Sequence, residues 1–334
     1  MFMVLRESMG ISGIKIGHVT DLMNATGCTV VLSERGAVGG VDVRGSAPGT
    51  RETDLLRPGN LINEIHGVLL SGGSAYGLDA AAGVMQYLEE KQVGYRVGKS
   101  VVPIIPTAII SDLNIGNHQV RPNAEDGYRA CEVARSDNLM EGTIGAGTGA
   151  TVGKAFGLAS ATKGGLGIFG HEIEPGLIIF ALVVVNSWGD VVDPDTGRIV
   201  AGPLDNNRAG LVNTMDLMAN PESALDPNEI GAGNNTTIGI LITNAGLDKG
   251  QANKLAGRGQ DGIALAVRPA HTMADGDTVF TLATGTWHGE IDHRLLTKVG
   301  AIAAVVMSKA IVRAVTNADG LAGIPSIKEI SVGS

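Results

Sequence analysis

Apolar residues recur at helical spacing in three segments of the chain. They are Leu78, Ala81, Met85 and Leu88; Ala252, Leu255, Ala256, Ile263 and Ala266; and Leu295, Val299, Ile302, Val306 and Ala310. Such stripes predict helices that each bury one face. We expect a fourth helix from Asn123 through Glu132.

Short β-branched and apolar runs between glycines predict the strands. They are TVVLS, GVDVRG and HGVLLS within residues 28–71, LIIFALVVV at 177–185, TTIGILIT at 236–243 and TVFTLATG at 278–285. The run LIIFALVVV does not alternate, so we expect both of its faces to be covered. The glycine-dense stretch at 141–170 predicts further strands joined by close turns.

Other segments are predicted to bend or to lie outside regular structure. VVPIIPTAII at 101–110 is interrupted by two prolines, which confines it to an edge, a bend or a loop. Asp193–Gly197 predicts a turn, and residues 203–234 predict a long exposed connection. Strands dominate the middle and helices flank them, so we expect an α/β (α+β) protein with two sheets between helical layers. A length of 334 residues permits two domains, but we expect residues 1–334 to form one.

Composition and charge limit the classes of partner that we expect for this protein. Hydrophobic residues make up 44% and aromatic residues only 3%, with 49 glycines, which favours layers packed through small side chains. A net charge of −9 without a basic cluster argues against nucleic acid and anionic membranes as partners. The first ten residues lack the apolar core of a secretory signal, and the run at 177–185 is too short to span a bilayer. We therefore expect a cytoplasmic protein.

Four local motifs for cofactor or metal chemistry fail on their details. GAGTGA at 145–150 fits a dinucleotide fingerprint but lacks a clear helix and the later acidic residue. GK at 153–154 is followed by Ala155, where a phosphate loop needs a hydroxyl. Tyr76 replaces the second glycine of a nucleophile elbow, and HGEIDH at 288–293 lacks the order that places two imidazoles on one helical face. No cofactor and no metal site are predicted.

The sequence NNTT, in which Asn235 precedes Thr236, has two interpretations. Threonines at the start of a strand are common, so the pair can serve β structure alone. Alternatively, the Thr236 hydroxyl attacks the carbonyl of Asn235, and hydrolysis of the resulting ester frees an N-terminal threonine. Its α-amine would titrate near ~7.7–8.0 and could accept the hydroxyl proton at neutral pH.

Two carboxylates open the strand that is predicted next. Asp275 and Asp277 are two positions apart, and side chains at i and i+2 share one face of a strand. Such a pair could orient the hydroxyl and ammonium groups of a threonine. An ordinary turn containing Asp-Gly explains the same residues equally well.

Several motifs together resemble the self-processing N-terminal-nucleophile family of L-aminopeptidase/D-esterases, β-aminopeptidases and nylon-oligomer hydrolases. In chain order they are IKIGHVTD, SGGSAYGLDAAAGV, GAGTGATVGK, KGGLG, VVVN, NNTTIG and DGDTVF, and the resemblance covers residues 13–314. It implies a four-layer αββα sandwich, cleavage between Asn235 and Thr236, and fragments 1–235 and 236–334 that stay bound. It also implies a ring-like homotetramer.

The resemblance assigns roles by matching motifs. Thr236 is similar to the nucleophile, Lys154 to the lysine beside it, and Asn186 to an asparagine that donates to the oxyanion. Asp275 and Asp277 resemble the carboxylate pair of the nylon-oligomer hydrolases, whereas the aminopeptidase branch tends to have a serine and a glutamate there.

One position departs from the family pattern, and another remains open. The family often has a tyrosine at the substrate, but IISDL places Ser111 there, so Ser111 is the candidate substrate-binding residue. Lys163 fits either a solvated hairpin lysine or a functional group.

The resemblance implies a Thr-nucleophile amidohydrolase for short linear substrates, either 6-aminohexanoate oligomers or peptides with a free amino end. L-aminopeptidase/D-esterase or β-aminopeptidase activity and acyl transfer to an amine are alternatives within the fold. A non-catalytic ligand-binding or assembly protein is the alternative of another class.

Overall fold

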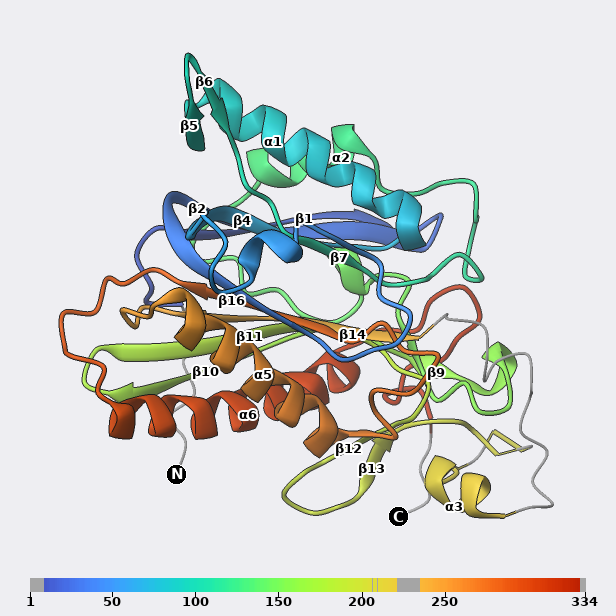
Figure 1. Cartoon of the computed structure of the whole chain (residues 1–334). Coiled ribbons are helices and arrows are strands. Elements are labelled where there is room, and N and C mark those ends of the chain that lie inside the picture. The colour runs from blue at the N-terminus through green and yellow to red at the C-terminus, as the bar shows by residue number, and fades with distance from the viewer. Residues whose placement is uncertain (1–8, 206, 209, 221–234, 331–334) are drawn as a thin grey trace.

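One long strand, β2 (Thr26–Val43), belongs to both sheet layers of the protein. The computed structural model describes residues 9–205, 207–208, 210–220 and 235–330. The first half of β2 pairs with β1 (Ile14–Asp21), and its second half pairs with β16 (Thr278–Ala283). Its register with β4 (Glu64–Ser71) shifts between these halves, so one hydrogen-bonded sheet folds over into two layers (Figure 1).

The sequence predicted two separate strands, TVVLS and GVDVRG, where the structure has β2 alone. The residues between these runs contain charges and glycines, which predict a turn. In the structure the chain does not reverse direction there, and β2 continues with a register shift against β4.

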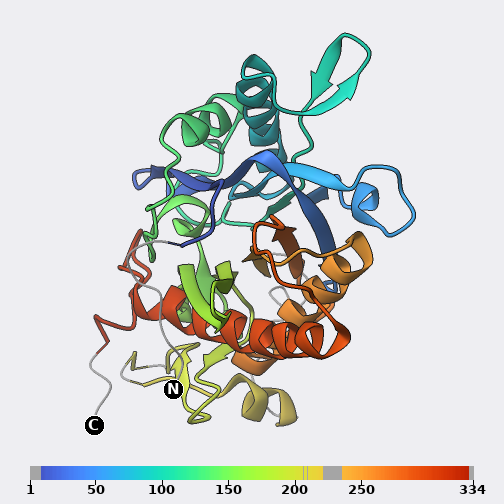
Figure 2. The same cartoon turned by 90° about the vertical axis from the view of Figure 1, so that its left-hand side faces the viewer.

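Helices cover the outer faces of both layers. The helices α1 (Ala80–Glu90) and α2 (Ala124–Glu132) lie over the layer of β1 and β4, and α5 (Lys249–Ala266) and α6 (His293–Thr316) lie under the other (Figure 1). Figure 2 shows the same succession of layers from the side. The predicted four-layer αββα sandwich is confirmed.

The lower layer contains the strands that position the candidate site. Its order is β10–β11–β14–β16–β2, with β10 (Gly165–Glu174), β11 (Leu177–Asn186) and β14 (Thr236–Thr243). The strands β14 and β16 are parallel, whereas β11 and β14 are antiparallel. The end of β11, the start of β14 and the start of β16 therefore meet at one edge of the layer.

The remaining elements are short. The strands are β3 (Thr50–Arg51), β5 (Tyr95–Val97), β6 (Ser100–Val102), β7 (Thr107–Ile109), β8 (Thr151–Val152), β9 (Thr162–Lys163), β12 (Asp190–Val192), β13 (Ile199–Ala201) and β15 (Val267–Arg268). The helical ones are α3 (Thr214–Ala219) and the 3-10 turns Asp54–Leu56, Ser74–Asp79, Gly145–Gly147 and Leu158–Ser160. The predicted connection at 203–234 thus contains a helix, α3. Residues 221–234 of this connection lie outside the described part of the chain.

Both faces of β11 are buried, as its sequence predicts. Ile179, Ala181 and Val183 pack in the core that α5 and α6 cover, and Phe180 and Leu182 pack in the core between the sheets. Burying one such large apolar side chain stabilises the fold by about 1.5–3 kcal/mol.

Small residues allow the helices to pack directly on the strands. At Gly40 in β2, an added Cβ would lie 2.3 Å from the backbone carbon of Ala252 in α5. No side chain fits there, because helix and strand backbones are in contact.

The helix α6 is long and apolar enough to span a membrane by length and composition. Half of its most apolar window is buried inside the structure, and it packs against α5, β10 and β11. Asp292, within HGEIDH, caps its first turn by accepting from the backbone of Leu295 at 2.7 Å. These contacts describe a core helix.

Candidate active site

Thr236 is the first residue of β14 and is 3% exposed. Its hydroxyl donates to the backbone carbonyl of Asn235, which is the carbonyl of the peptide bond that joins the two residues. The same carbonyl oxygen accepts from the backbone N–H of Gly276 at 3.0 Å. One carbonyl group therefore lies between a hydroxyl and a backbone donor.

The close approach of Gly276 depends on its lack of a side chain. A Cβ built at this position would lie 3.0 Å from the Thr236 hydroxyl oxygen and 2.8 Å from the carbonyl oxygen of Ala47. Asn235 itself is fully buried, and its side-chain amide has no hydrogen bond to any residue in the described ranges.

The two predicted carboxylates are the sequence neighbours of Gly276, one on each side. Asn235 and Asp275 form a parallel bridge, and Asp277 accepts from the backbone N–H of Thr237 at 2.7 Å. Asp275 accepts from the backbone N–H of Thr272 at 2.7 Å. The parallel pairing of β14 with β16 brings this turn beside Thr236.

Burial and like charge perturb Asp275. Its removal from water, and then the negative charge of Asp277, raise its pKa to about 6, while the positive charge of Lys154 acts in the opposite direction. A carboxyl with this pKa can exchange a proton near neutral pH.

Asn186 lies on the neighbouring strand β11, and Lys154 lies on the loop that follows β8. Asn186 ends β11 and is the register partner of Thr236. The Lys154 ammonium donates to the side-chain oxygen and the backbone oxygen of Asn186, each at 3.1 Å, and to both oxygens of Thr151 at 3.2 Å. The structure thus brings together all five residues predicted as catalytic.

Ser111 lies beside this group, and its backbone contacts Asn186. The Asn186 amide donates to the Ser111 backbone carbonyl at 3.2 Å. Ser111 also lines a cavity of about 20 Å³ together with Thr151 and Lys154, which is room for about one water molecule.

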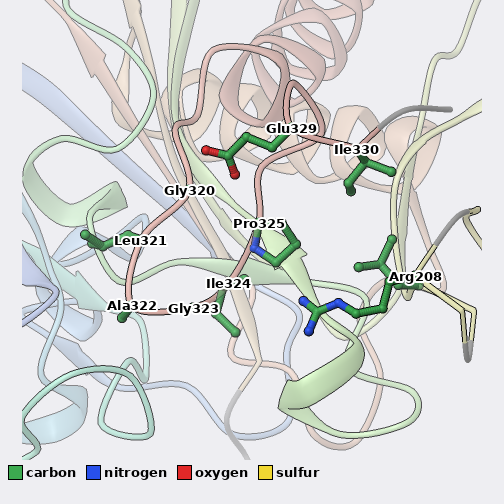
Figure 3. A pocket seen from close by; sticks show the side chains of 10 residues that line it. Arg208, Gly320, Leu321, Ala322, Gly323, Ile324, Pro325, Glu329 and Ile330 are labelled. Atoms are coloured by element: carbon green, nitrogen blue, oxygen red, sulfur yellow. The ribbon is translucent and has the colours of Figure 1, made fainter.

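A much larger pocket, of about 740 Å³, lies elsewhere and contains none of the predicted site residues. Figure 3 shows the side chains of Arg208 and Glu329 on separate segments that line it. It lies along the loop that follows α6, and the apolar residues Ile115, Leu158 and Ile324 pack nearby.

Two functional candidates were missed or left open by sequence reasoning. Lys163 is fully buried rather than solvated, and it donates to the carbonyls of Ala150 at 2.7 Å and Gly164 at 3.3 Å. Burial lowers its pKa to about 7, against the attraction of Asp112. The KGGLG motif was its only sequence signal. His271, which gave none, contacts Asp277 at 2.8 Å.

Comparison with known proteins gives one family and a consistent fold. The family model described as peptidase family S58 matches residues 9–327. An uncharacterised aminopeptidase of Mycobacterium leprae is 41% identical, with 95% of this chain and 91% of that protein covered. A 6-aminohexanoate-oligomer endohydrolase of Agromyces sp. is 31% identical, with 90% and 84% covered.

Among solved structures, an L-aminopeptidase D-Ala-esterase/amidase from Ochrobactrum anthropi superposes with a TM-score of 0.71 at 18% identity. The match covers 96% of this chain and 88% of that one. That protein is described as a variant of the Ntn hydrolase fold, and the αββα layers described above are this fold.

Proposed function

The chain belongs to peptidase family S58, and on this premise we propose that it cuts its own backbone between Asn235 and Thr236 and then uses Thr236 as its nucleophile. It is an amide-bond hydrolase, as family membership and the aminopeptidase and endohydrolase relatives show. The site proposed for that activity is the one around Thr236.

One observation carries the proposal for self-cleavage. The Thr236 hydroxyl and the Gly276 N–H both contact the carbonyl oxygen of Asn235. Attack of the hydroxyl on this carbonyl would place negative charge on an oxygen that already accepts from a backbone donor at 3.0 Å. Donors at 2.7–3.1 Å from a developing oxyanion stabilise it by roughly 2.7–4 kcal/mol.

The proton and bond changes of self-cleavage balance as follows. The aspartate pair accepts the hydroxyl proton as the Thr236 oxygen bonds to the Asn235 carbonyl carbon. Collapse breaks the C–N bond, and the amine of Thr236 takes up the proton as it leaves. Water then hydrolyses the ester, which gives a carboxylate on Asn235 and a free hydroxyl and amine on Thr236.

Thr236, Lys154 and Asn186 serve the second reaction, the hydrolysis of a substrate amide. The free amine of Thr236 accepts the hydroxyl proton as the oxygen attacks the substrate amide, and it donates a proton to the departing amine. Lys154 orders Asn186 through contacts of 3.1 Å, and the Asn186 amide is the donor we assign to the oxyanion of the substrate.

We propose short linear amides as substrates. Two substrate classes are considered, and an assay can distinguish them. The 41% identical relatives are named aminopeptidases, which favours peptides with a free amino end. The pair Asp275 and Asp277 and the relative from Agromyces favour 6-aminohexanoate oligomers. Amino-acid anilides, β-peptides and 6-aminohexanoate oligomers tested in parallel separate the two classes.

The test of maturation is a denaturing gel of the purified chain. Wild type should give fragments 1–235 and 236–334, and Thr236→Ala should give one intact chain without amide hydrolysis. N-terminal sequencing of the small fragment should begin Thr236-Thr237. If the wild-type protein stays intact and hydrolyses none of the three substrate classes, the proposal is refuted and a binding function is favoured.

A further inference from the structure

The carboxylate of Asp277 is shared between two segments that flank the site. Its Oδ1 accepts from the backbone N–H of Thr237 at 2.7 Å. Its Oδ2 accepts from the backbone N–H of His271 at 3.0 Å and contacts the ring Nδ1 of His271 at 2.8 Å. The side chain of Asp277 is 2% exposed, so these contacts fix a buried carboxylate.

His271 adopts a backbone conformation that residues with a side chain rarely adopt. Its φ is +57°, in the left-handed region. Such strain persists only where surrounding contacts impose it, and here the backbone and the ring bind the same carboxylate oxygen. The conformation brings the backbone N–H and the ring Nδ1 of one residue to the same oxygen of Asp277.

The charges around the ring favour its protonated form. Burial opposes protonation, but the hydrogen bond and the charge of Asp277 outweigh it, so the pKa of His271 lies above 6.5. The backbone of Gln260 acts in the same direction, and Arg44 acts against it. The charge of Arg44 is itself paired, with Asp42 at 3.2 Å and Asp261 at 3.3 Å.

We propose that His271 is a positioning residue that holds Asp277 against β14 and supplies a positive charge beside the pair of Asp275 and Asp277. The inference rests on the proposed function of this aspartate pair. Without the imidazolium, two buried carboxylates would face each other with less compensation, and Asp275 would keep its proton to higher pH.

His271→Asn separates charge from geometry. Asparagine tolerates a positive φ better than most residues, and its amide can donate to Asp277 without carrying a charge. His66→Asn is the matched control, because the buried His66 ring accepts from the backbone of Ile104 at 3.2 Å and an asparagine oxygen can replace it.

The first readout is the pH dependence of the self-cleavage rate, because the aspartate pair is the proton acceptor proposed for that step. His271→Asn should slow cleavage and move the acidic limb of this profile upward by roughly half a pH unit or more. His66→Asn should leave the limb in place. A His271→Asn chain that cleaves with the wild-type limb overturns the inference and leaves the proposed function standing, whereas a wild-type chain that does not cleave overturns the proposed function first.

The second readout needs neither cleavage nor activity. An NMR titration of the His271 ring in the full-length Thr236→Ala chain should give a pKa above 6.5, and adding Asp277→Asn should lower it by about one unit. A ring that titrates at or below 6.5, or that ignores the loss of the Asp277 charge, overturns the inference even where His271→Asn does not fold.

Discussion

The contact between Gly276 and Thr236 predicts that Gly276→Ala slows self-cleavage. The new methyl group would lie 3.0 Å from the nucleophilic oxygen and 2.8 Å from the carbonyl oxygen of Ala47, both inside ordinary van der Waals contact. The turn must then shift by a few tenths of an ångström, and its N–H would move from the Asn235 carbonyl.

The size of the effect follows from the cost of such overpacking. Inserting a methyl group into a well-packed site typically costs about 1–3 kcal/mol. If this strain falls on the attack geometry, each 1.36 kcal/mol slows the step about tenfold, so cleavage should slow by roughly 5-fold to 150-fold.

The assay follows the newly made chain on denaturing gels after a pulse of cell-free synthesis, with thermal melting to verify folding. Gly246→Ala is the matched control, because Gly246 is exposed and an added Cβ would meet nothing within 4 Å. Cleavage of the folded Gly276→Ala chain at the wild-type rate would refute the role given to this contact.

Two further predictions concern stability. In the uncut Thr236→Ala chain, Asp275 binds its proton more tightly in the folded state than in the unfolded state. Its contribution of about 3 kcal/mol to the free energy of unfolding is therefore lost as the pH rises from about 4 to about 6. Adding Asp275→Asn should make the free energy of unfolding, measured in urea, nearly independent of pH over this range. An unchanged slope would contradict the assigned pKa. Lys163→Met should destabilise the protein by about 1–3 kcal/mol, because it leaves the buried carbonyls of Ala150 and Gly164 without their donor. Melting curves should show this loss but none for the exposed control Lys99→Met, and equal melting temperatures would show that the buried ammonium is dispensable.

Elements with a strong local pattern could be predicted from the sequence. The stripes of α5 and α6 and the run of β11 record burial directly, because each side chain's environment follows from its position on one helix or strand. The continuity of β2 could not be predicted, because its second half is held by β16, more than 200 residues later in the chain.

The candidate site divides in the same way. Thr236 and the aspartate pair carry local signals in NNTT and DGD, and the parallel pairing of β14 and β16 makes them neighbours. His271 had no local signal, and the KGGLG motif did not show whether Lys163 is solvated or functional, since both roles depend on which carboxylate or carbonyl the fold places against them. Tertiary contacts decide whether such a polar residue is solvated or buried.

The order β11–β14–β16–β2 has a consequence for the direction of maturation. The strands after the proposed cut, β14 and β16, are inserted between two strands that precede it. Escape of the small piece would leave two open strand edges and an uncovered apolar surface, which water cannot repair. After unfolding, a cleaved protein would have to insert those two strands from a separate fragment, so the proposed cleavage would make refolding depend on the association of two chains.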